Sequence, residues 1–334
     1  MAQVRNLRQL AALAGVSAST VSRALADSPK LAKSTREMIR SLASENMYHR
    51  NVTARNLRNK CTGSIGVVVP MGADARASAS DPFFVTMFGL IWDCALSRDL
   101  NVFLWRISPA GDDWLGAFGE AGRVDGLIIL GQADQFDAIE KVSSRYHPLV
   151  AWGANVPGQV HCSVGSDNRL GGRLAAEHLL ERGCRRIVFL GDPCGIEIAD
   201  RLAGCRDALQ GADMEHRLRV APVRFGARAA YDDIAGFLRS TNDVPDGVIA
   251  ASDLIAMSAL NAFAESGFVA PRDFRVIGFD GLAVGELATP AISTISQDLA
   301  AGAGHLVDRL LRRIAGEDAD SVIMAPELKI RQST

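Results

Sequence analysis

Hydroxyl side chains gather in one short stretch near the start of the 334-residue chain, at Ser17, Thr20 and Ser22. Hydroxyls suit phosphate oxygens, and such contacts position a protein on DNA without reading its sequence. Residues 1–60 hold 11 lysines and arginines against 3 acidic residues, a net charge of +8, whereas the remainder holds 25 against 35, a net of −10. A basic segment on an acidic body indicates nucleic-acid binding, because phosphate neutralisation dominates non-specific affinity.

Two short helices are predicted in this basic segment. Asn6 and Gln9 form a capping box at the start of the first helix. Gly15 ends it, because glycine tolerates the positive φ of a helix terminus. Ser17 caps a second helix that runs to about Leu25. Two such helices joined by a tight glycine turn form a helix-turn-helix.

Residues 7–25, LRQLAALAGVSASTVSRAL, resemble the helix-turn-helix of the LacI/GalR repressor family. The shared pattern is Ala-Gly-Val-Ser, two variable residues, then Thr-Val-Ser-Arg. The resemblance implies that Ala18 and Ser19 occupy operator-discriminating positions and that Arg23 reads a guanine edge. Arginine with guanine is the commonest specific contact in the major groove. Because Ala18 and Ser19 are small, we expect Arg23 to carry much of the direct readout.

Residues 48–58, YHRNVTARNLR, resemble the hinge helix of the same family. The resemblance implies that Leu57, in an Ala-Arg-x-Leu sequence, wedges into the minor groove at the operator centre, which costs unstacking but bends the DNA. Packing of Leu57 on the core is the alternative. The predicted hinge contacts also include Asn51, Ala54 and Arg58, and Arg50 stands where the family usually has proline.

A third helix is predicted to run to about Asn46. The family usually has a capping serine at its start, where this chain has Ala32. Ser34 and Glu37 offer a replacement capping box. The helix is therefore expected to begin slightly later than in the family.

From Ser64 onward, short apolar segments alternate with helical ones. The predicted strands are Ile65–Val69, Val102–Trp105, Leu127–Leu130, Leu149–Trp152, Ile187–Leu190, Gly247–Ala250 and Val276–Phe279. The predicted helices between them include Met87–Arg98, Leu170–Arg182, Leu202–Gln210 and Leu254–Ser266. Apolar strands flanked by helices indicate parallel sheets that are covered on both faces. So many strands favour two sheets, with a ligand beyond their carboxyl ends in a cleft between two lobes.

The body also resembles the family's core, which is similar to periplasmic sugar-binding proteins. Its landmarks extend from Ser64-Ile65-Gly66 to Thr294-Ile295-Ser296-Gln297. We therefore expect a multidomain chain with an all-α helix-turn-helix head at 1–47, a hinge helix and linker at 48–63, and a two-lobed α/β core at 64–334. Lobe 1 is predicted at about 64–164 and 293–323, and lobe 2 at about 165–292 and 324–334.

The resemblance implies an effector site in the cleft. Its predicted members are Asp81, Phe83, Asp167, Arg201, Phe225, Ser252, Asp280 and Gln297, with Phe84 as the alternative to Phe83. Carboxylates, a guanidinium and amides suit vicinal hydroxyls, and an aromatic face suits the C–H surface of a sugar. The alternatives are that Arg201 is a buried ion-pair partner and that Asp280 is a turn residue at a strand end.

Other classes of function lack their motifs. The chain has no GxGxxG after a strand, no GxxxxGK[ST] and no GxSxG, and its 6 cysteines form no CxxC. We therefore expect no catalysis, no metal and no cofactor other than a small-molecule effector. Short apolar runs and an N-terminus without a signal-like segment favour a cytoplasmic, nucleoid-associated protein that contacts no membrane.

These features predict a repressor of sugar-utilisation genes that binds a pseudo-palindromic operator, with a central CG step, as a homodimer. The last residues, MAPELKIRQST, contain no leucine heptads, so a coiled-coil tetramer is not expected. Whether the effector releases or strengthens DNA binding stays open. The alternatives are a regulator with a purine or other metabolite as corepressor, a sugar-binding receptor without a regulatory role, and a sugar-processing enzyme.

Overall fold

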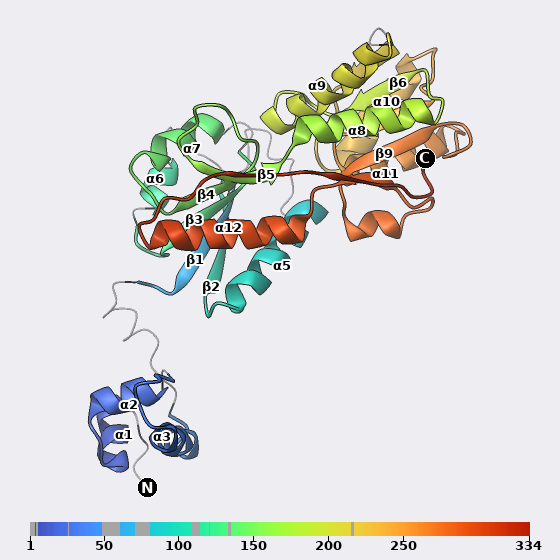
Figure 1. The fold of residues 1–334 in the computed structure, drawn as a ribbon. Coiled ribbons are helices and arrows are strands. Elements are labelled where there is room, and N and C mark those ends of the chain that lie inside the picture. The colour runs from blue at the N-terminus through green and yellow to red at the C-terminus, as the bar shows by residue number, and fades with distance from the viewer. Residues whose placement is uncertain are drawn as a thin grey trace. The chain divides into compact units, whose positions relative to one another are not determined.

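The computed structural model describes residues 4, 6–25, 27–48, 61–70, 81–107, 114–119, 121–132, 135–214 and 217–334. The chain divides into two compact units, Met1–Thr62 and Gly63–Thr334, coloured from blue to red along the sequence (Figure 1). We call the first unit the head and the second unit the core. Hinge residues 49–60 lie outside the described residues.

The head contains three helices, α1 (Leu7–Ala14), α2 (Ala18–Leu25) and α3 (Lys33–Glu45). They enclose a small apolar cluster that consists of Leu10, Ala11, Val21, Ala24, Ile39 and Ala43. The predicted cap of α1 is confirmed, since Asn6 Oδ1 accepts from the Gln9 N–H at 3.0 Å and Gly15 has φ 66°. The two helices and their turn therefore follow the local signals of the sequence.

The predicted late start of α3 is wrong. The helix begins at Lys33, and Ala32 occupies the N-cap position without a side-chain hydrogen bond. Arg36 and Arg40 each lie 3.2 Å from the Asp27 carboxylate, which links the first turns of α3 to the end of α2. Tertiary packing of the helix therefore outweighs the alternative capping box.

The first lobe of the core is built on a parallel sheet with the strand order β11-β5-β4-β3-β1-β2. Its strands are β1 (Ser64–Pro70), β2 (Asn101–Ile107), β3 (Gly126–Leu130), β4 (Leu149–Trp152), β5 (Cys162–Ser166) and β11 (Val322–Met324). One apolar cluster joins a face of the sheet to α5 (Pro82–Leu96) and α12 (Leu299–Ile314). Another joins the opposite face to α6 (Trp114–Gly119) and α7 (Phe136–Ser143). Both faces of this sheet are thus covered, as predicted (Figure 1).

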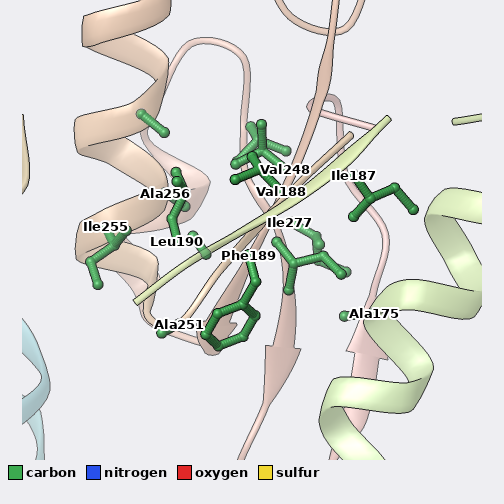
Figure 2. Packing of buried hydrophobic residues seen from close by; sticks show 14 of the residues in the cluster. Ala175, Ile187, Val188, Phe189, Leu190, Val248, Ala251, Ile255, Ala256 and Ile277 are labelled. Carbon is green, nitrogen blue, oxygen red and sulfur yellow. The ribbon is translucent and has the colours of Figure 1, made fainter. Parts of the chain in front are cut away.

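The second lobe contains a sheet with the order β12-β10-β9-β8-β6-β7, in which β12 alone runs antiparallel. Its strands are β6 (Ile187–Leu190), β7 (Leu218–Ala221), β8 (Gly247–Ala250), β9 (Arg275–Asp280), β10 (Ser293–Ser296) and β12 (Glu327–Lys329). Its helices are α8 (Asn168–Glu181), α9 (Ile196–Gly211), α10 (Ala227–Ser240), α11 (Asp253–Glu265) and the short 3₁₀ helix η3 (Ala283–Glu286). Figure 2 shows how Phe189, Val188 and Ile277 pack at the centre of this lobe, where each is almost wholly buried.

Strand β10 differs from the sequence-based division of the lobes. The prediction placed residues 293–323 in lobe 1, but Ser293 pairs with Ile277 of β9 in the second sheet. Ile292 and Ile295 are fully buried in the apolar cluster of the second lobe. The burial of these isoleucines therefore fixes β10 to lobe 2, and the chain returns to lobe 1 only after it.

The chain passes between the lobes at three places that lie close together, after β5, β10 and β11. Ser166 Oγ donates to the carbonyl of Gln297 at 3.4 Å, and the Asp167 N–H donates to the carbonyl of Met324 at 2.9 Å. These bonds connect the three crossings. They make the crossings the natural hinge between the two lobes.

No helix among the described residues is long and apolar enough to cross a membrane.

Candidate DNA-reading helix and effector site

The N-terminal end of α2 presents a cluster of hydroxyls. Ser17 Oγ accepts from the Thr20 N–H at 3.1 Å, which confirms that Ser17 caps the helix. The same oxygen lies 2.8 Å from both Ser19 Oγ and Thr20 Oγ1. Ser17 and Ser19 are exposed, and Thr20 is half-buried. A helix N-terminus with free hydroxyls can receive a phosphate.

Ser19 and Arg23 form the exposed face of α2. They are four residues apart, so their side chains lie on the same side of the helix. Ala18 and Ser22 are half-buried, and Ala18 packs against the apolar cluster of the head. Of the predicted reading residues, Ser19 and Arg23 are thus the more accessible. The other predicted DNA contacts, Asn51, Ala54, Leu57 and Arg58, lie outside the described residues.

In the core, the Arg201 side chain is buried among polar and aromatic partners. Its Nε donates to Asn168 Oδ1 at 2.8 Å, and a terminal nitrogen donates to the carbonyl of Ala251. The guanidinium carbon lies 3.7 Å from the centre of the Phe279 ring. Burial lowers the pKa of Arg201, while the negative charges of nearby carboxylates, Asp280 foremost, oppose that shift. Arg201 is therefore a fixed cation in a low-dielectric site.

Asp280 and Gln297 meet at the carboxyl ends of β9 and β10. Gln297 Nε2 donates to Asp280 Oδ1 at 2.8 Å, and both side chains are buried. Burial raises the pKa of Asp280 well above its usual value, Arg201 opposes the shift, and Asp253 and Asp81 add to it. Asp280 has φ 120°, a conformation that side chains rarely adopt.

Ser252 and Asp81 complete this group. Ser252 follows β8, and its hydroxyl caps α11 by accepting from the Ile255 N–H at 3.2 Å. Asp81 caps α5 through the Phe83 N–H at 2.9 Å, and burial raises its pKa. Thus β8, β9 and β10, neighbours in the sheet, bring Ser252, Asp280 and Gln297 to one edge. We call Asp81, Arg201, Ser252, Asp280 and Gln297 the polar cluster.

The contacts of the other three predicted effector residues are with different side chains. Phe83 packs against Trp152 of the first lobe, with ring centres 6.2 Å apart. Asp167 caps α8 through the Leu170 N–H at 2.8 Å and lines a surface pocket with Arg169 and Asp207. Phe225 is half-buried against the apolar cluster of the second lobe. The structure does not join these three to the polar cluster.

Two residues beside the polar cluster were missed by sequence reasoning. Asn168 binds Arg201, as described above. Asp253 is fully buried, accepts from Thr294 Oγ1 at 2.6 Å and from the Leu282 N–H at 2.7 Å, and has its pKa raised by burial to about 6. Each directly follows a predicted site residue in the sequence, so polar pairs after strands were the available signal.

Comparison with known proteins agrees with both units. Residues 6–51 match the model of bacterial regulatory proteins of the lacI family, and residues 176–334 match a periplasmic binding protein-like domain. The HTH-type transcriptional regulator CelR of Thermobifida fusca is 30% identical over 339 residues, which cover 98% of this chain and 97% of CelR. The chain belongs to the LacI family of bacterial transcriptional regulators. The predicted family and fold class are thereby confirmed.

Solved structures of this family extend the agreement to the whole chain. The lac repressor dimer bound to operator and the anti-inducer ONPF is 26% identical with a TM-score of 0.82, and 98% of each chain is covered. The complex of the transcriptional regulator CelR with cellobiose is 28% identical with a TM-score of 0.71, covering 99% of this chain and 100% of CelR. Family members are DNA-binding regulators rather than enzymes.

Proposed function

We propose that this chain is a sequence-specific repressor whose hold on operator DNA is set by a sugar or sugar derivative bound between the lobes of its core. The observation that carries the proposal is the burial of Arg201, Asp280 and Gln297 together at the carboxyl edge of the second sheet. Unpaired buried polar groups cost about 1–3 kcal/mol each, so such a cluster favours a ligand with several hydroxyls. Relatives support a sugar, since one structure holds cellobiose and another holds ribose.

The cluster has both signs of hydrogen-bonding capacity. Arg201 donates only, whereas Gln297 donates and accepts. Asp280, whose pKa burial raises, is held toward the neutral form that also donates and accepts. A sugar hydroxyl has the same dual capacity. This match supports a polyhydroxylated effector over an apolar one.

DNA binding is assigned to α2 and to the hinge. Ser19 and Arg23 form the exposed face that enters the major groove, and the hydroxyls of Ser17, Thr20 and Ser22 hold phosphates. Asn51, Ala54, Leu57 and Arg58 form the hinge contacts, with Leu57 as the minor-groove wedge. The segments are the head at 1–47, the hinge at 48–63 and the core from 64 onward.

A homodimer is supported by an apolar stripe on the first lobe. Val85, Trp92 and Leu96 of α5 are 54%, 62% and 63% exposed, and their spacing puts them on one helix face. Leu104, on the edge strand β2, is 52% exposed. A second copy is the occupant that a two-fold symmetric, pseudo-palindromic operator requires.

The test combines selection of DNA with titration of metabolites. Genomic fragments retained by the purified protein are sequenced, and their affinity is measured with and without cellobiose, ribose, lactose, hypoxanthine or guanine. We expect inverted half-sites around a central CG step, and a sugar that changes fragment affinity.

Several outcomes would contradict this proposal. A purine that changes the affinity when no sugar does would establish the corepressor alternative. Chemical conversion of a bound sugar would show an enzyme. Retention of all fragments equally, with every metabolite tested, would exclude a sequence-specific repressor.

A further inference from the structure

The first residues of the core are held by an unusual set of hydrogen bonds. Asp125 Oδ2 accepts from the Gly63 N–H at 2.7 Å and from the Ser64 N–H at 3.3 Å, and the Asp125 N–H donates to the Ser64 carbonyl at 2.8 Å. Asn101 donates to the Gly63 carbonyl from its backbone N–H at 3.0 Å and from Nδ2 at 3.4 Å. We call Gly63, Ser64, Asn101 and Asp125 the Gly63 clamp.

The clamp fixes the direction of the chain as well as its position. Gly63 has φ 64°, in the left-handed region where a side chain is strained. Burial and the negative charge of Asp125 raise the pKa of Tyr146 to about 12, so the carboxylate acts as a charged acceptor close to this ring. Hydrogen bonds to a charged acceptor are stronger than those between neutral groups.

The clamp lies at the amino ends of β1 and β3, where Ser64 and Gly126 begin their strands. The polar cluster lies beyond the carboxyl ends of strands in the other sheet. Because β1 pairs on both sides, with β2 and β3, a shift of the first sheet carries Ser64 with it. The clamp extends that rigid connection by one residue, to the point where the core ends and the hinge segment joins it.

We propose that the Gly63 clamp passes a rearrangement of the core to the chain that precedes residue 63, with Asp125 as the positioning residue. A loose joint at Gly63 would absorb the movement of the sheet, whereas a joint held by five hydrogen bonds transmits it. The inference rests on the function proposed above. It assigns the clamp to regulation, and neither to DNA contact nor to effector contact.

The experiment measures coupling separately from binding. The ratio of fragment affinities with and without the most effective sugar of the panel is compared in the wild-type protein, Asp125→Ala, Asp125→Asn and Gly63→Ala. Coupling of this kind is typically about 5–150-fold in affinity. We expect Asp125→Ala to bring the ratio below about threefold while its sugar Kd without DNA stays within about twofold of wild type.

Further variants separate the clamp from general damage. Asp125→Asn keeps one acceptor oxygen, so an intermediate ratio is expected. Gly63→Ala keeps the carboxylate but strains the backbone, so it should also lower the ratio. Asp137→Ala, an exposed carboxylate on α7 of the same lobe, should leave the ratio unchanged. Hydrogen exchange of residues 61–66 should accelerate in Asp125→Asn, without acceleration across the second lobe.

A full wild-type ratio in Asp125→Ala would overturn the inference. If Asp125→Ala loses sugar binding, the decision passes to Asp125→Asn and Gly63→Ala, and a full ratio in both overturns it as well. A wild-type protein that selects no DNA, or responds to no sugar, instead contradicts the proposed function. The two failures are thus distinguished by the wild-type measurement.

Discussion

In the head, the candidate DNA-contacting side chains occupy consecutive positions from Ser17 to Arg23, whereas the polar cluster of the core draws on segments from Asp81 to Gln297. One helix and its cap are enough to place the first set. The second set depends on the order of three neighbouring strands and on the packing of α9 beside them. A change in the head therefore removes one contact, while a change in the core disturbs a network.

The two regions also differ in their electrostatics. Ser19 and Arg23 are exposed, so their attraction to phosphates is screened by salt. Asp253, Asp280 and Arg201 are buried, and burial displaces the pKa of each. We therefore expect DNA binding to respond mainly to ionic strength, and the core to respond to pH. Four substitutions test this contrast.

The largest effect is expected for Arg201→Met. Removing the guanidinium leaves Asn168 without its donor and takes away the cation nearest the buried Asp280. Breaking a buried charged network by one partner typically costs about 3–5 kcal/mol. Urea unfolding of the full chain should show this loss in the core transition. Arg173→Met, on the exposed face of α8, is the matched control, and an equal loss in both variants would refute a network role.

Asp253→Asn should change how stability depends on pH. Burial raises the pKa of Asp253 in the folded chain to about 6, above its ordinary 3.8. The folded state thus binds this proton more tightly, so the contribution of Asp253 is complete below about pH 4 and is lost as pH rises through 6. The stability advantage of wild type over Asp253→Asn should fall by about 3 kcal/mol across that window. Urea unfolding at several pH values measures it, and a constant difference would contradict the burial argument.

Arg23→Ala should reduce specific DNA binding without affecting the core. Loss of a bidentate contact to guanine costs about 1–3 kcal/mol, or about 5–150-fold in affinity. Competition with bulk DNA at fixed salt separates this loss from the general loss of one charge. Arg8→Ala removes an exposed charge from α1 and serves as the control. If Arg8→Ala weakens specific binding as much as Arg23→Ala does, Arg23 is not the reader.

The smallest effect is expected for Ser17→Ala. The substitution removes the acceptor of the Thr20 N–H, and loss of such a cap costs about 1 kcal/mol. Amide exchange of Thr20 measured by NMR should then accelerate about fivefold, while Ser17→Thr should restore protection. Unchanged exchange in Ser17→Ala would mean that packing alone holds the start of α2. Ser44→Ala, an exposed position late in α3, controls for the loss of a hydroxyl in the head.

Particular elements show how far sequence reasoning reached. The caps of α1 and α2 were predictable because Asn6 and Ser17 act on backbone groups within three residues. Strands β1 and β3 were predictable as continuous apolar runs. Strand β5, with the sequence CSVGS, was missed because only its position between β4 and β11 makes small and polar residues suitable there.

The candidate site divides in the same way. Four of its predicted residues, Arg201, Ser252, Asp280 and Gln297, do gather in the second lobe, beside Asn168 and Asp253, which were not predicted. Phe83 and Phe225 pack against apolar clusters, because aromatic area is buried wherever a core is nearest. A residue type and its place after a strand therefore indicated polar sites better than aromatic ones.

By itself, the sequence determined the three-helix head, the charge contrast between head and core, and most of the apolar strands. These depend on caps, glycine turns and short runs, whose physics acts within a few residues. Only the tertiary structure decided that β10 joins the second sheet, that Asp253 lies under the turn at Asp280, and that Asp125 holds Gly63. Each of these joins groups far apart in the chain, and strand order, which no local signal encodes, brings them within hydrogen-bonding distance.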